Sequence, residues 1–458
     1  MKVSRRVAIF AGVLSVALSR PSVFAQDLDR MDQVVRSYSE DAKTFMGAVL
    51  VARDGKVLLS RGYGHANMEW SIPNTPATRF RIGSVTKQFT ATAILLLEER
   101  GRLSVDDPVK KHLPDAPAAW DAVTIRHLLT HSSGIPSFTS FPDYRSVKTF
   151  STTPEKIVAS FRDKPLEFQP GEKWNYSNSG YVLLGHLIEK ISGGTYERFI
   201  RENIFTPLGM TDSGYDLNRT VLPRRAAGYS PSPAGPVNAE FIHMSVPHGA
   251  GALYSTTEDL LRWSQGLFGG KVLSTASFEK MTTAFKSDYG FGVAVRMLNG
   301  RRVIDHGGGI EGFNSMLSYH PDTKLTIAVL SNLNGAAAAE IAGKLAAVAH
   351  GDKVRLSSER KEITLAPDVL ARYVGVYELT PKVTMTIALA DGRLTTQLSG
   401  QPAVALFAES EGTFFLRVAD AEVEFVKDEK GLVTHAVLRQ GGRDQKAPRR
   451  SDVAGEKK

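Results

Sequence analysis

The chain has 458 residues, of which 42% are hydrophobic and 23% charged, so it can bury substantial cores and is long enough for two or three domains. It contains no cysteine, which excludes disulfides, a thiolate nucleophile, a lipid-modified cysteine anchor and cysteine-based metal sites. The formal net charge of +8 is too small to indicate a nucleic-acid-binding protein.

Residues 1–25 have the pattern of a secretory signal peptide. Lys2, Arg5 and Arg6 precede an apolar run over residues 7–18, and small residues at 23–25 form a cleavage site before Gln26. Removal of the four basic residues of this segment would lower the net charge from +8 to about +4. No later apolar stretch is long enough to span a membrane. We therefore expect a periplasmic or secreted protein without a stable membrane anchor, exported by a Sec or a twin-arginine route.

Residues 26–350 have the element order strands, helices, strands, helix. Two strand-like runs flank Arg53-Asp54-Gly55, which predicts a β-hairpin over residues 45–64. The nearly uniformly apolar run 84–101 predicts a buried helix, and residues 102–240 are mostly helix and loop. A further helix is expected from residue 255, followed by strands at 291–298, 313–320 and 325–332 and a helix at 336–350. This order predicts an α+β fold, in which helices cover an antiparallel sheet interrupted by a helical insertion.

The last hundred residues differ in composition from the rest. Residues 351–364 form a polar, charged linker, and residues 365–447 contain short strand-like runs separated by turn signals such as Asp391-Gly392. This spacing predicts a small C-terminal β-barrel, with a β-sandwich as the alternative. The basic tail 448–458 is expected to be a solvated chain end, so nucleic acid is not an expected partner.

The first candidate catalytic pair is Ser84 and Lys87. Ser-x-x-Lys occurs three times, but the matches at Ser277 and Ser358 lie in polar segments. Ser84 alone follows a glycine and begins a deeply apolar helix, where residues three apart share a face. A lysine can take the proton of a serine hydroxyl only if burial lowers its pKa from about 10.4. The alternative interpretation is a serine N-cap beside a lysine that reaches solvent.

The second candidate pair is Tyr176 and Asn178, in the Tyr-x-Asn sequence that precedes an amphipathic helix. A phenol near a lysine can relay protons, and a carboxamide can both donate to and accept from a substrate amide or ester. The alternative is a tyrosine packed under a loop, followed by an asparagine in a turn.

The third candidate element is His306-Gly307-Gly308-Gly309, which follows a strand-like run. Glycines at a strand edge allow a ligand to approach the backbone, and one of their N–H groups could form an oxyanion hole with the Ser84 N–H. The glycines also match the dinucleotide pattern GxGxxG, but a strand rather than a helix is expected to follow them. A lipase-type α/β-hydrolase is excluded because the chain has no GxSxG motif.

His127 and His131 are four residues apart and could share a helix face. The glutamate of the zinc-protease pattern is missing, and no third ligand is evident. We therefore expect neither a metal nor an organic cofactor.

Together, Ser84-x-x-Lys87, Tyr176-x-Asn178 and His306-Gly307-Gly308 occur in the order of the three active-site motifs of the serine β-lactamase and penicillin-binding protein superfamily. The chain most resembles its class C-like branch, also over residues 126–136, 169–185 and 249–263. The resemblance covers about residues 30–350 and implies a β-lactamase/transpeptidase-like fold with a helical subdomain. It also implies an acylated nucleophile at Ser84, acid–base work by Lys87 and Tyr176, and substrate orientation by Asn178. Gly309 rather than Gly308 is the favoured oxyanion-hole glycine.

The third motif departs from the pattern of many penicillin-recognising members, which have Lys-Thr-Gly or Lys-Ser-Gly at this position. His306 and Gly307 supply neither an ammonium nor a hydroxyl for a substrate carboxylate. The resemblance therefore favours an esterase or a D-amino-acid peptidase acting on a small molecule or short peptide. A true β-lactamase is the enzymatic alternative, and a penicillin-binding sensor that does not turn over is the alternative of another class. The oligomeric state stays open.

Overall fold

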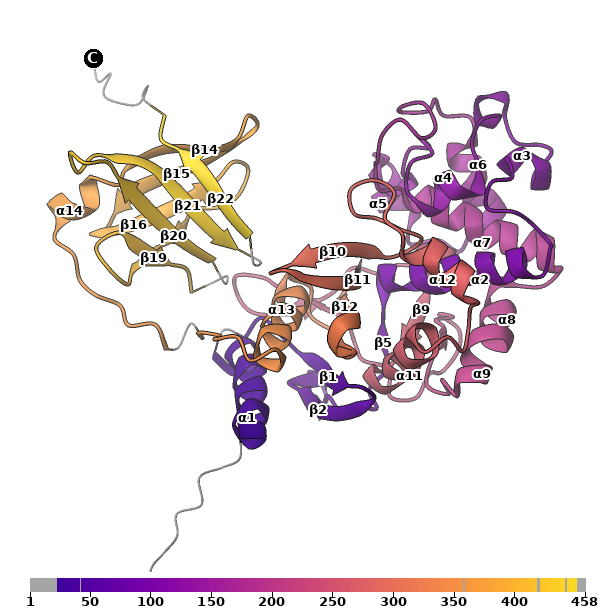
Figure 1. The fold of residues 1–458 in the computed structure, drawn as a ribbon, viewed down its shortest axis with the longest axis horizontal. Helices are drawn as coiled ribbons and strands as arrows, with labels where there is room; N and C mark the ends of the chain where they lie inside the picture. Colours follow the sequence, from indigo (N-terminus) through magenta and orange to yellow (C-terminus); the bar gives the residue numbers. More distant parts are fainter. Residues whose placement is uncertain (1–22, 42, 357–358, 418–420, 441–442, 451–458) are drawn as a thin grey trace, which may run out of the picture.

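The computed structural model describes residues 23–41, 43–356, 359–417, 421–440 and 443–450. Most of the predicted signal peptide and of the basic tail therefore lies outside the described residues. The larger part of the molecule is built on a six-stranded antiparallel sheet in the order β10-β11-β12-β13-β1-β2 (Figure 1). Its strands are β1 (Gly47–Arg53), β2 (Lys56–Tyr63), β10 (Ala294–Leu298), β11 (Arg301–Ile310), β12 (Phe313–His320) and β13 (Leu325–Ser331).

The predicted hairpin between β1 and β2 is confirmed. Asp54 and Gly55 have φ angles of 47° and 77°, the left-handed conformation that a tight hairpin turn requires at both central residues. The first and the last strand of this sheet in chain order are neighbours: β1 pairs antiparallel with β13, with Gly47 opposite Ser331.

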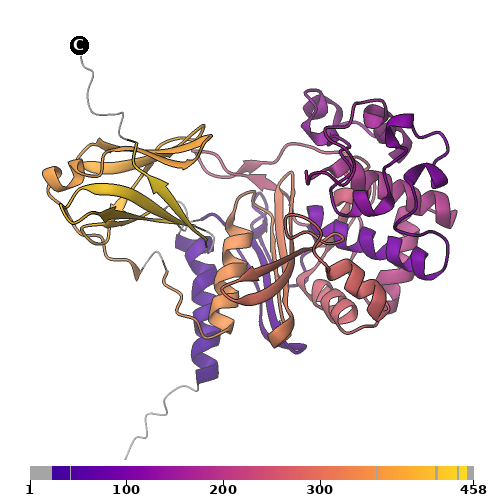
Figure 2. The same cartoon turned by 45° about the horizontal axis from the view of Figure 1, so that its top comes forward.

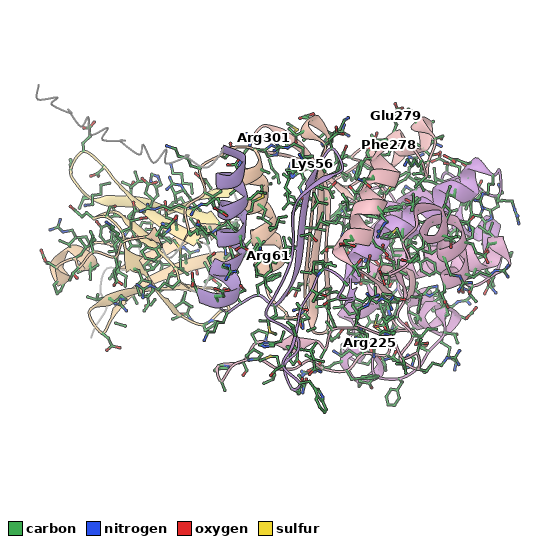
Figure 3. The ribbon with its side chains drawn as sticks, turned by 90° about the horizontal axis from the view of Figure 1, so that it is seen from below. Lys56, Arg61, Arg225, Phe278, Glu279 and Arg301 are labelled. Carbon is green, nitrogen blue, oxygen red and sulfur yellow. The ribbon has the colours of Figure 1, made fainter. Side chains whose placement is uncertain are left out.

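Both faces of the sheet are buried, and alternate residues of each strand serve different cores. Val49 and Val51 of β1 pack with the helices α1 (Val23–Arg36) and α13 (Ala337–Ala349) on one face. Ala48 and Leu50, which point the other way, belong to the larger core shared with the helical region. The sheet therefore lies between two helical layers, as Figures 2 and 3 show from two further directions.

The helical region lies on the other side of the sheet and is built mainly around α2 and α7. Its α-helices are α2 (Thr86–Glu99), α3 (Val109–His112), α4 (Ile125–Leu129), α5 (Tyr144–Val147), α6 (Pro154–Arg162), α7 (Asn178–Ser192), α8 (Tyr196–Ile200), α9 (Thr206–Leu208), α10 (His248–Gly251), α11 (Thr257–Phe268) and α12 (Thr275–Thr282). Shorter helical turns are η1 (Ser37–Asp41), η2 (Gly83–Val85), η3 (Ala118–Trp120), η4 (Phe138–Ser140), η5 (Arg201–Phe205) and η6 (Pro321–Thr323).

Three small sheets join the loops around the domain. β9 (Leu253–Ser255) lies between β5 (Phe80–Arg81) and β6 (Gly214–Tyr215). The other two are the pairs β3 (His65–Asn67) with β4 (Ile72–Pro73) and β7 (Tyr229–Ser230) with β8 (Val237–Asn238). The β5–β9 pairing holds the segment just before Ser84 in place, because Phe80 and Arg81 are opposite Ser255 and Tyr254.

The C-terminal residues form two antiparallel sheets with their own hydrophobic core, rather than the closed barrel that was expected. The chain crosses from one sheet to the other between two strands of only two residues each, and β14 meets the segment after β22 through a single bridge, Tyr377 with Arg449. The elements are α14 (Pro367–Ala371), β14 (Gly375–Thr380), β15 (Val383–Ala390), β16 (Arg393–Leu398), β17 (Val404–Ala405), β18 (Phe407–Ala408), β19 (Thr413–Phe415), β20 (Ala421–Lys427), β21 (Val433–Gln440) and β22 (Arg443–Pro448).

The linker between the two parts is attached at both of its ends. Leu356 is buried in the core formed with α1 and α13, and Glu359 forms an ion pair with Arg30. Arg360, one residue later, binds Glu409 and Glu422 of the C-terminal part, both at 2.8 Å. Within the described residues, no helix is long and apolar enough to cross a membrane.

Candidate active site

Ser84 lies in the turn η2, which packs directly on strand β11. Gly83 has φ +48°, and a Cβ atom placed on it would lie 2.9 Å from the backbone nitrogen of Gly309. Only a glycine permits this close approach. The turn leads into α2, whose N-terminal end contributes a partial positive potential. Ser84 is therefore held between a helix start and the glycine-rich strand.

Lys87 is fully buried, and its side-chain nitrogen lies among three oxygen atoms. The Nζ atom is 3.0 Å from Ser84 Oγ, 2.9 Å from Asn178 Oδ1 and 2.8 Å from the carbonyl oxygen of Ala250. Burial lowers the pKa of Lys87 well below its usual value. In the neutral amine, two N–H groups can donate to the two carbonyl oxygens, and the lone pair is left to accept a hydrogen bond from the Ser84 hydroxyl.

Tyr176 and Asn178 lie close to Lys87, and Asn178 is the first residue of α7. Lys87 Nζ is 4.8 Å from the centre of the Tyr176 ring. Burial raises the pKa of Tyr176, and a hydrogen bond with Ser84 partly opposes this shift, so the phenol is neutral at pH 7. Asn178 Nδ2 donates to Thr139 Oγ1 at 3.1 Å, which fixes the amide with its oxygen toward Lys87.

The glycines of β11 differ in their surroundings. A Cβ atom on Gly308 would lie 2.1 Å from the Ile82 carbonyl oxygen and 2.2 Å from Ser315 Oγ, so this position must be glycine. Gly309 lines the cleft beside Gly83 and Ser84, whereas Gly307 is exposed and is not among the residues that line it. Of the three, Gly309 is thus the glycine that lines the cleft together with Ser84.

His306 is buried beneath the site. Its Nε2 atom is 2.8 Å from the Tyr289 hydroxyl, and its Nδ1 atom is 2.6 Å from the Gly307 carbonyl oxygen. Burial is the main reason that the pKa of His306 falls to about 3. A neutral ring that donates from Nδ1 and accepts at Nε2 satisfies both contacts. The ring is accordingly placed to support the strand rather than to present a positive charge to a ligand.

Several groups that the sequence did not single out complete the site. His131 has φ +57°, accepts a hydrogen bond from the backbone N–H of Ser177, and packs its ring 4.2 Å from that of Tyr176. Tyr289 also packs against His131, with ring centres 4.7 Å apart. His131 lies within residues 126–136, which carry part of the family resemblance. The carbonyl oxygen of Ala250 belongs to the backbone, so no residue type in the sequence could have indicated its role.

The site opens into a cleft of about 420 Å³. Its walls combine polar and apolar groups, and Ser84, Thr139, Asn178 and Asn334 contribute neutral polar side chains. The residues that line it are Gly83, Ser84, Phe138, Thr139, Tyr144, Asn178, Ile242, Pro247, Ala250, Gly251, Gly309, Ile310, Glu311 and Asn334. This size is within the range of small-molecule sites.

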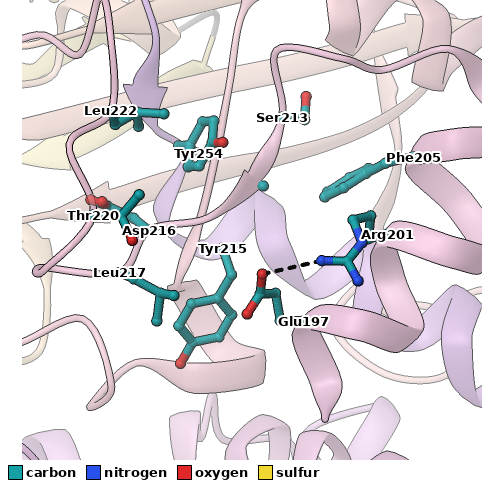
Figure 4. Close-up of a pocket in the computed structure, with 11 residues that line it drawn as sticks. Glu197, Arg201, Phe205, Ser213, Tyr215, Asp216, Leu217, Thr220, Leu222 and Tyr254 are labelled. Atoms are coloured by element: carbon teal, nitrogen blue, oxygen red, sulfur yellow. Dashed lines mark ion pairs between the residues drawn. The ribbon is translucent and has the colours of Figure 1, made fainter. Parts of the chain in front are cut away.

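A second cavity of about 170 Å³ lies between α8, η5 and β6 (Figure 4). Glu197 and Arg201, which form an ion pair at 3.5 Å, line it together with Tyr215 and Tyr254. None of the predicted site residues lines this cavity.

The histidines that were considered as metal ligands have other partners. The Nδ1 atom of His127 accepts the N–H of Thr124 in the cap of α4, whereas His131 binds Ser177. In the part of the chain that the structure describes, no group of three or more histidine or acidic side chains could hold a metal ion.

Comparison with known proteins gives matches to both parts of the chain. The family profile described as Beta-lactamase matches residues 31–351, and that of a domain of unknown function (DUF3471) matches residues 359–450. "Penicillin-binding protein 4*" of Bacillus subtilis (strain 168) is 32% identical over 430 residues, which cover 88% of this chain and 94% of that protein.

Two solved structures are similar to most of the chain or to the larger part. The octameric penicillin-binding protein homologue from Pyrococcus abyssi has a TM-score of 0.66 and 28% identity, with 92% of this chain and 100% of that one covered. A D-stereospecific amidohydrolase from Streptomyces sp. has a TM-score of 0.61 and 28% identity, with 72% and 99% covered.

Proposed function

The chain belongs to the β-lactamase family of serine hydrolases, and from that premise we propose that it cleaves a small ester or amide through an acyl-enzyme formed on Ser84. The observation that carries the proposal is the position of Lys87. Its buried amine lies 3.0 Å from the Ser84 hydroxyl and has two carbonyl oxygens to receive its protons. A serine so placed has the adjacent base that its weak nucleophilicity requires.

Acylation begins when Ser84 Oγ attacks the substrate carbonyl carbon and its proton passes to Lys87. The carbonyl oxygen becomes an oxyanion, which the N–H groups of Ser84 and Gly309 stabilise. The bond to the leaving amine or alcohol then breaks, and the leaving group takes up the proton through Tyr176. Because burial raises the pKa of Tyr176 and lowers that of Lys87, the amine is the base and the phenol passes the proton on.

Deacylation uses a water molecule as the nucleophile. The water loses a proton to Lys87, directly or through the Tyr176 hydroxyl, and attacks the ester carbonyl, and the same two N–H groups stabilise the second oxyanion. When the tetrahedral intermediate collapses, the substrate acid leaves and Ser84 recovers its proton. Asn178 holds the Lys87 amine in position throughout and lines the cleft beside the acyl group.

The surroundings of His306 support a substrate without an essential carboxylate. His306 occupies the position of the third-motif base, but it is buried, and its pKa of about 3 leaves it neutral at pH 7. A neutral, buried ring gives no ion pair to the carboxylate of a penicillin or of a D-alanyl peptide. We therefore favour an esterase or a D-amino-acid amidase or peptidase over a β-lactamase. The similarity to a D-stereospecific amidohydrolase supports the same choice.

Residues 1–25 support export to the periplasm or the medium. Exported protein whose amino-terminal sequence starts at Gln26 would agree with this part of the proposal, and retention of residues 1–25 would oppose it.

The reaction can be tested with three substrates and the Ser84→Ala variant as control. We expect rapid turnover of a short-chain p-nitrophenyl ester or a D-alanyl p-nitroanilide, with little turnover of a chromogenic cephalosporin. Ser84→Ala should lower kcat by at least about 10³-fold, as removal of the nucleophile does in acyl-transfer enzymes.

Other results of the same assay would replace the proposal. Efficient cephalosporin hydrolysis would indicate a β-lactamase. One equivalent of product without turnover would indicate a penicillin-binding sensor. Equal rates for the wild type and Ser84→Ala would show that Ser84 is not the nucleophile.

A further inference from the structure

The charge of the cleft wall indicates what kind of substrate group it binds. Among the described residues that line the cleft, Glu311 is the single carboxylate, and there is no lysine, arginine or histidine. The same cleft is also lined by three large and mainly apolar side chains, Phe138, Tyr144 and Ile242. A ligand in this cleft therefore meets one acidic side chain among neutral polar and apolar ones.

Glu311 is held in place by an ion-pair network that reaches across from the helical region. Its Oε1 atom is 2.6 Å from Nζ of Lys148, which follows α5 and is itself only 8% exposed. Lys148 also binds Glu240 at 2.9 Å, and Glu240 binds Arg145. The two positive and the two negative charges of this network therefore cancel.

The carboxylate keeps the capacity to bind a ligand. Lys148 does not line the cleft, whereas Glu311 does, so the acidic end of the network faces the cleft. A carboxylate group can accept about four hydrogen bonds, of which the ion pair with Lys148 uses one. Glu311 follows Gly309 by two residues and lines the same cleft as Ser84.

We propose that Glu311 binds the free ammonium group of an amino-acid amide or ester whose apolar side chain packs on Phe138, Tyr144 and Ile242. The inference rests on the proposed acyl-enzyme function and names the substrate class. An ammonium is the complementary partner for a carboxylate that reaches the cleft and keeps lone pairs beyond its ion pair with Lys148, and a hydrogen bond to a charged group is stronger than a neutral one. The enzyme accordingly selects acyl donors with an unblocked amino group.

The test compares phenylalanine p-nitroanilide, as each enantiomer, with 3-phenylpropionyl p-nitroanilide, which lacks only the amino group. The measured quantity is the ratio of kcat/KM for the better enantiomer to kcat/KM for the substrate without the amine. In the wild type this ratio should exceed about tenfold, and Glu311→Gln should lower it by about tenfold to a hundredfold. The ratio in the wild type should also fall as pH rises through the pKa of the substrate amine, about 7.7 to 8.0.

Glu240→Gln is the matched control, because Glu240 binds the same lysine but does not line the cleft. We expect it to keep the wild-type ratio. An equal fall in Glu240→Gln and Glu311→Gln would overturn the inference, since the network alone would then explain the effect. A wild-type ratio near one would overturn it too, as would a ratio that Glu311→Gln leaves unchanged.

The failure of the proposed function would look different. If neither anilide nor a p-nitrophenyl ester is hydrolysed in a Ser84-dependent way, the acyl-enzyme proposal itself fails. The Glu311→Gln variant should still hydrolyse the substrate that lacks the amine, and the double variant with Ser84→Ala should not. This result shows that the site is still assembled in Glu311→Gln.

Discussion

Lys87 shows how the fold changes the chemistry of one residue. In water its amine would be protonated at pH 7, but here it is fully buried next to a hydroxyl and two carbonyl oxygens. Burial penalises the charged form and lowers the pKa of Lys87. A neutral lysine can act as a base, and the free energy needed to deprotonate Lys87 lowers the free energy of unfolding of the protein.

This cost predicts a pH dependence of stability. The unfolded chain binds a proton at Lys87 below about pH 10.4, whereas the folded protein does so only below its much lower pKa. Between these pKa values the unfolded state holds more protons, so the free energy of unfolding rises with pH by about 1.4 kcal/mol per unit. This penalty is absent in Lys87→Met.

Equilibrium urea unfolding of the wild type and Lys87→Met at pH 8.0 and 9.5 measures the effect. The wild type should gain about 2 kcal/mol more than the variant over this interval. Parallel changes in the two proteins would mean that Lys87 is charged in the folded state, and would contradict its role as the base.

At the scale of elements, the site depends on the contact between strand β11 and the turn η2. Gly83 and Gly308 allow the two backbones to approach, and Ser84 and Gly309 both line the cleft near this contact. In the proposed mechanism, each element contributes one N–H group to the oxyanion hole.

Gly308→Ala should therefore damage catalysis by displacing these two elements. The added Cβ atom would lie 2.1 Å from the Ile82 carbonyl oxygen, a backbone atom that cannot move without the turn that carries Ser84. Because displacements near 1 Å can cost about a hundredfold in rate, we expect kcat for the ester substrate to fall by about that factor.

Gly307→Ala is the control in the same strand. Its Cβ atom would make only ordinary contacts, at 3.7 Å to Met316 Sδ and to the Ser315 carbonyl oxygen. We expect kcat to change by less than about threefold. A large loss in Gly307→Ala, or none in Gly308→Ala, would show that the close contact between β11 and η2 does not set the geometry of the site.

At the scale of the whole molecule, the two parts have separate hydrophobic cores joined by an anchored linker. The described residues that line the cleft all lie between Gly83 and Asn334. The C-terminal part therefore contributes no described residue to the cleft wall, although Arg360 ties the linker to it through Glu409 and Glu422.

A chain that ends after Lys361 should fold and keep its activity. This end point retains Leu356 and Glu359, which bind the linker to the larger part through the buried core and Arg30. We expect kcat/KM for the ester substrate to remain within about threefold of the full-length value, measured on mature protein with and without residues 362–458. A loss of more than about tenfold in a truncated protein that is still folded by circular dichroism would show that the C-terminal sheets complete the site.

Local patterns in the sequence determined much of the fold. The Asp54-Gly55 turn, the buried helix after Ser84, and the order of strands and helices depend on φ preferences and apolar periodicity within short segments. The family could also be predicted, because Ser84-x-x-Lys87 and Tyr176-x-Asn178 are specific when they occur together in this order.

Tertiary packing alone decided which atoms surround these motifs. Segments far apart in the chain supply the surroundings of the site. They contribute the carbonyl oxygen of Ala250, the ring of His131, the buried His306 and the carboxylate of Glu311 at the cleft. The C-terminal strands likewise form two sheets, since closure of a barrel depends on pairing between the first and last strands. A residue type sets what a group can do chemically, whereas its pKa, its partners and its access to solvent depend on the neighbours that folding brings to it.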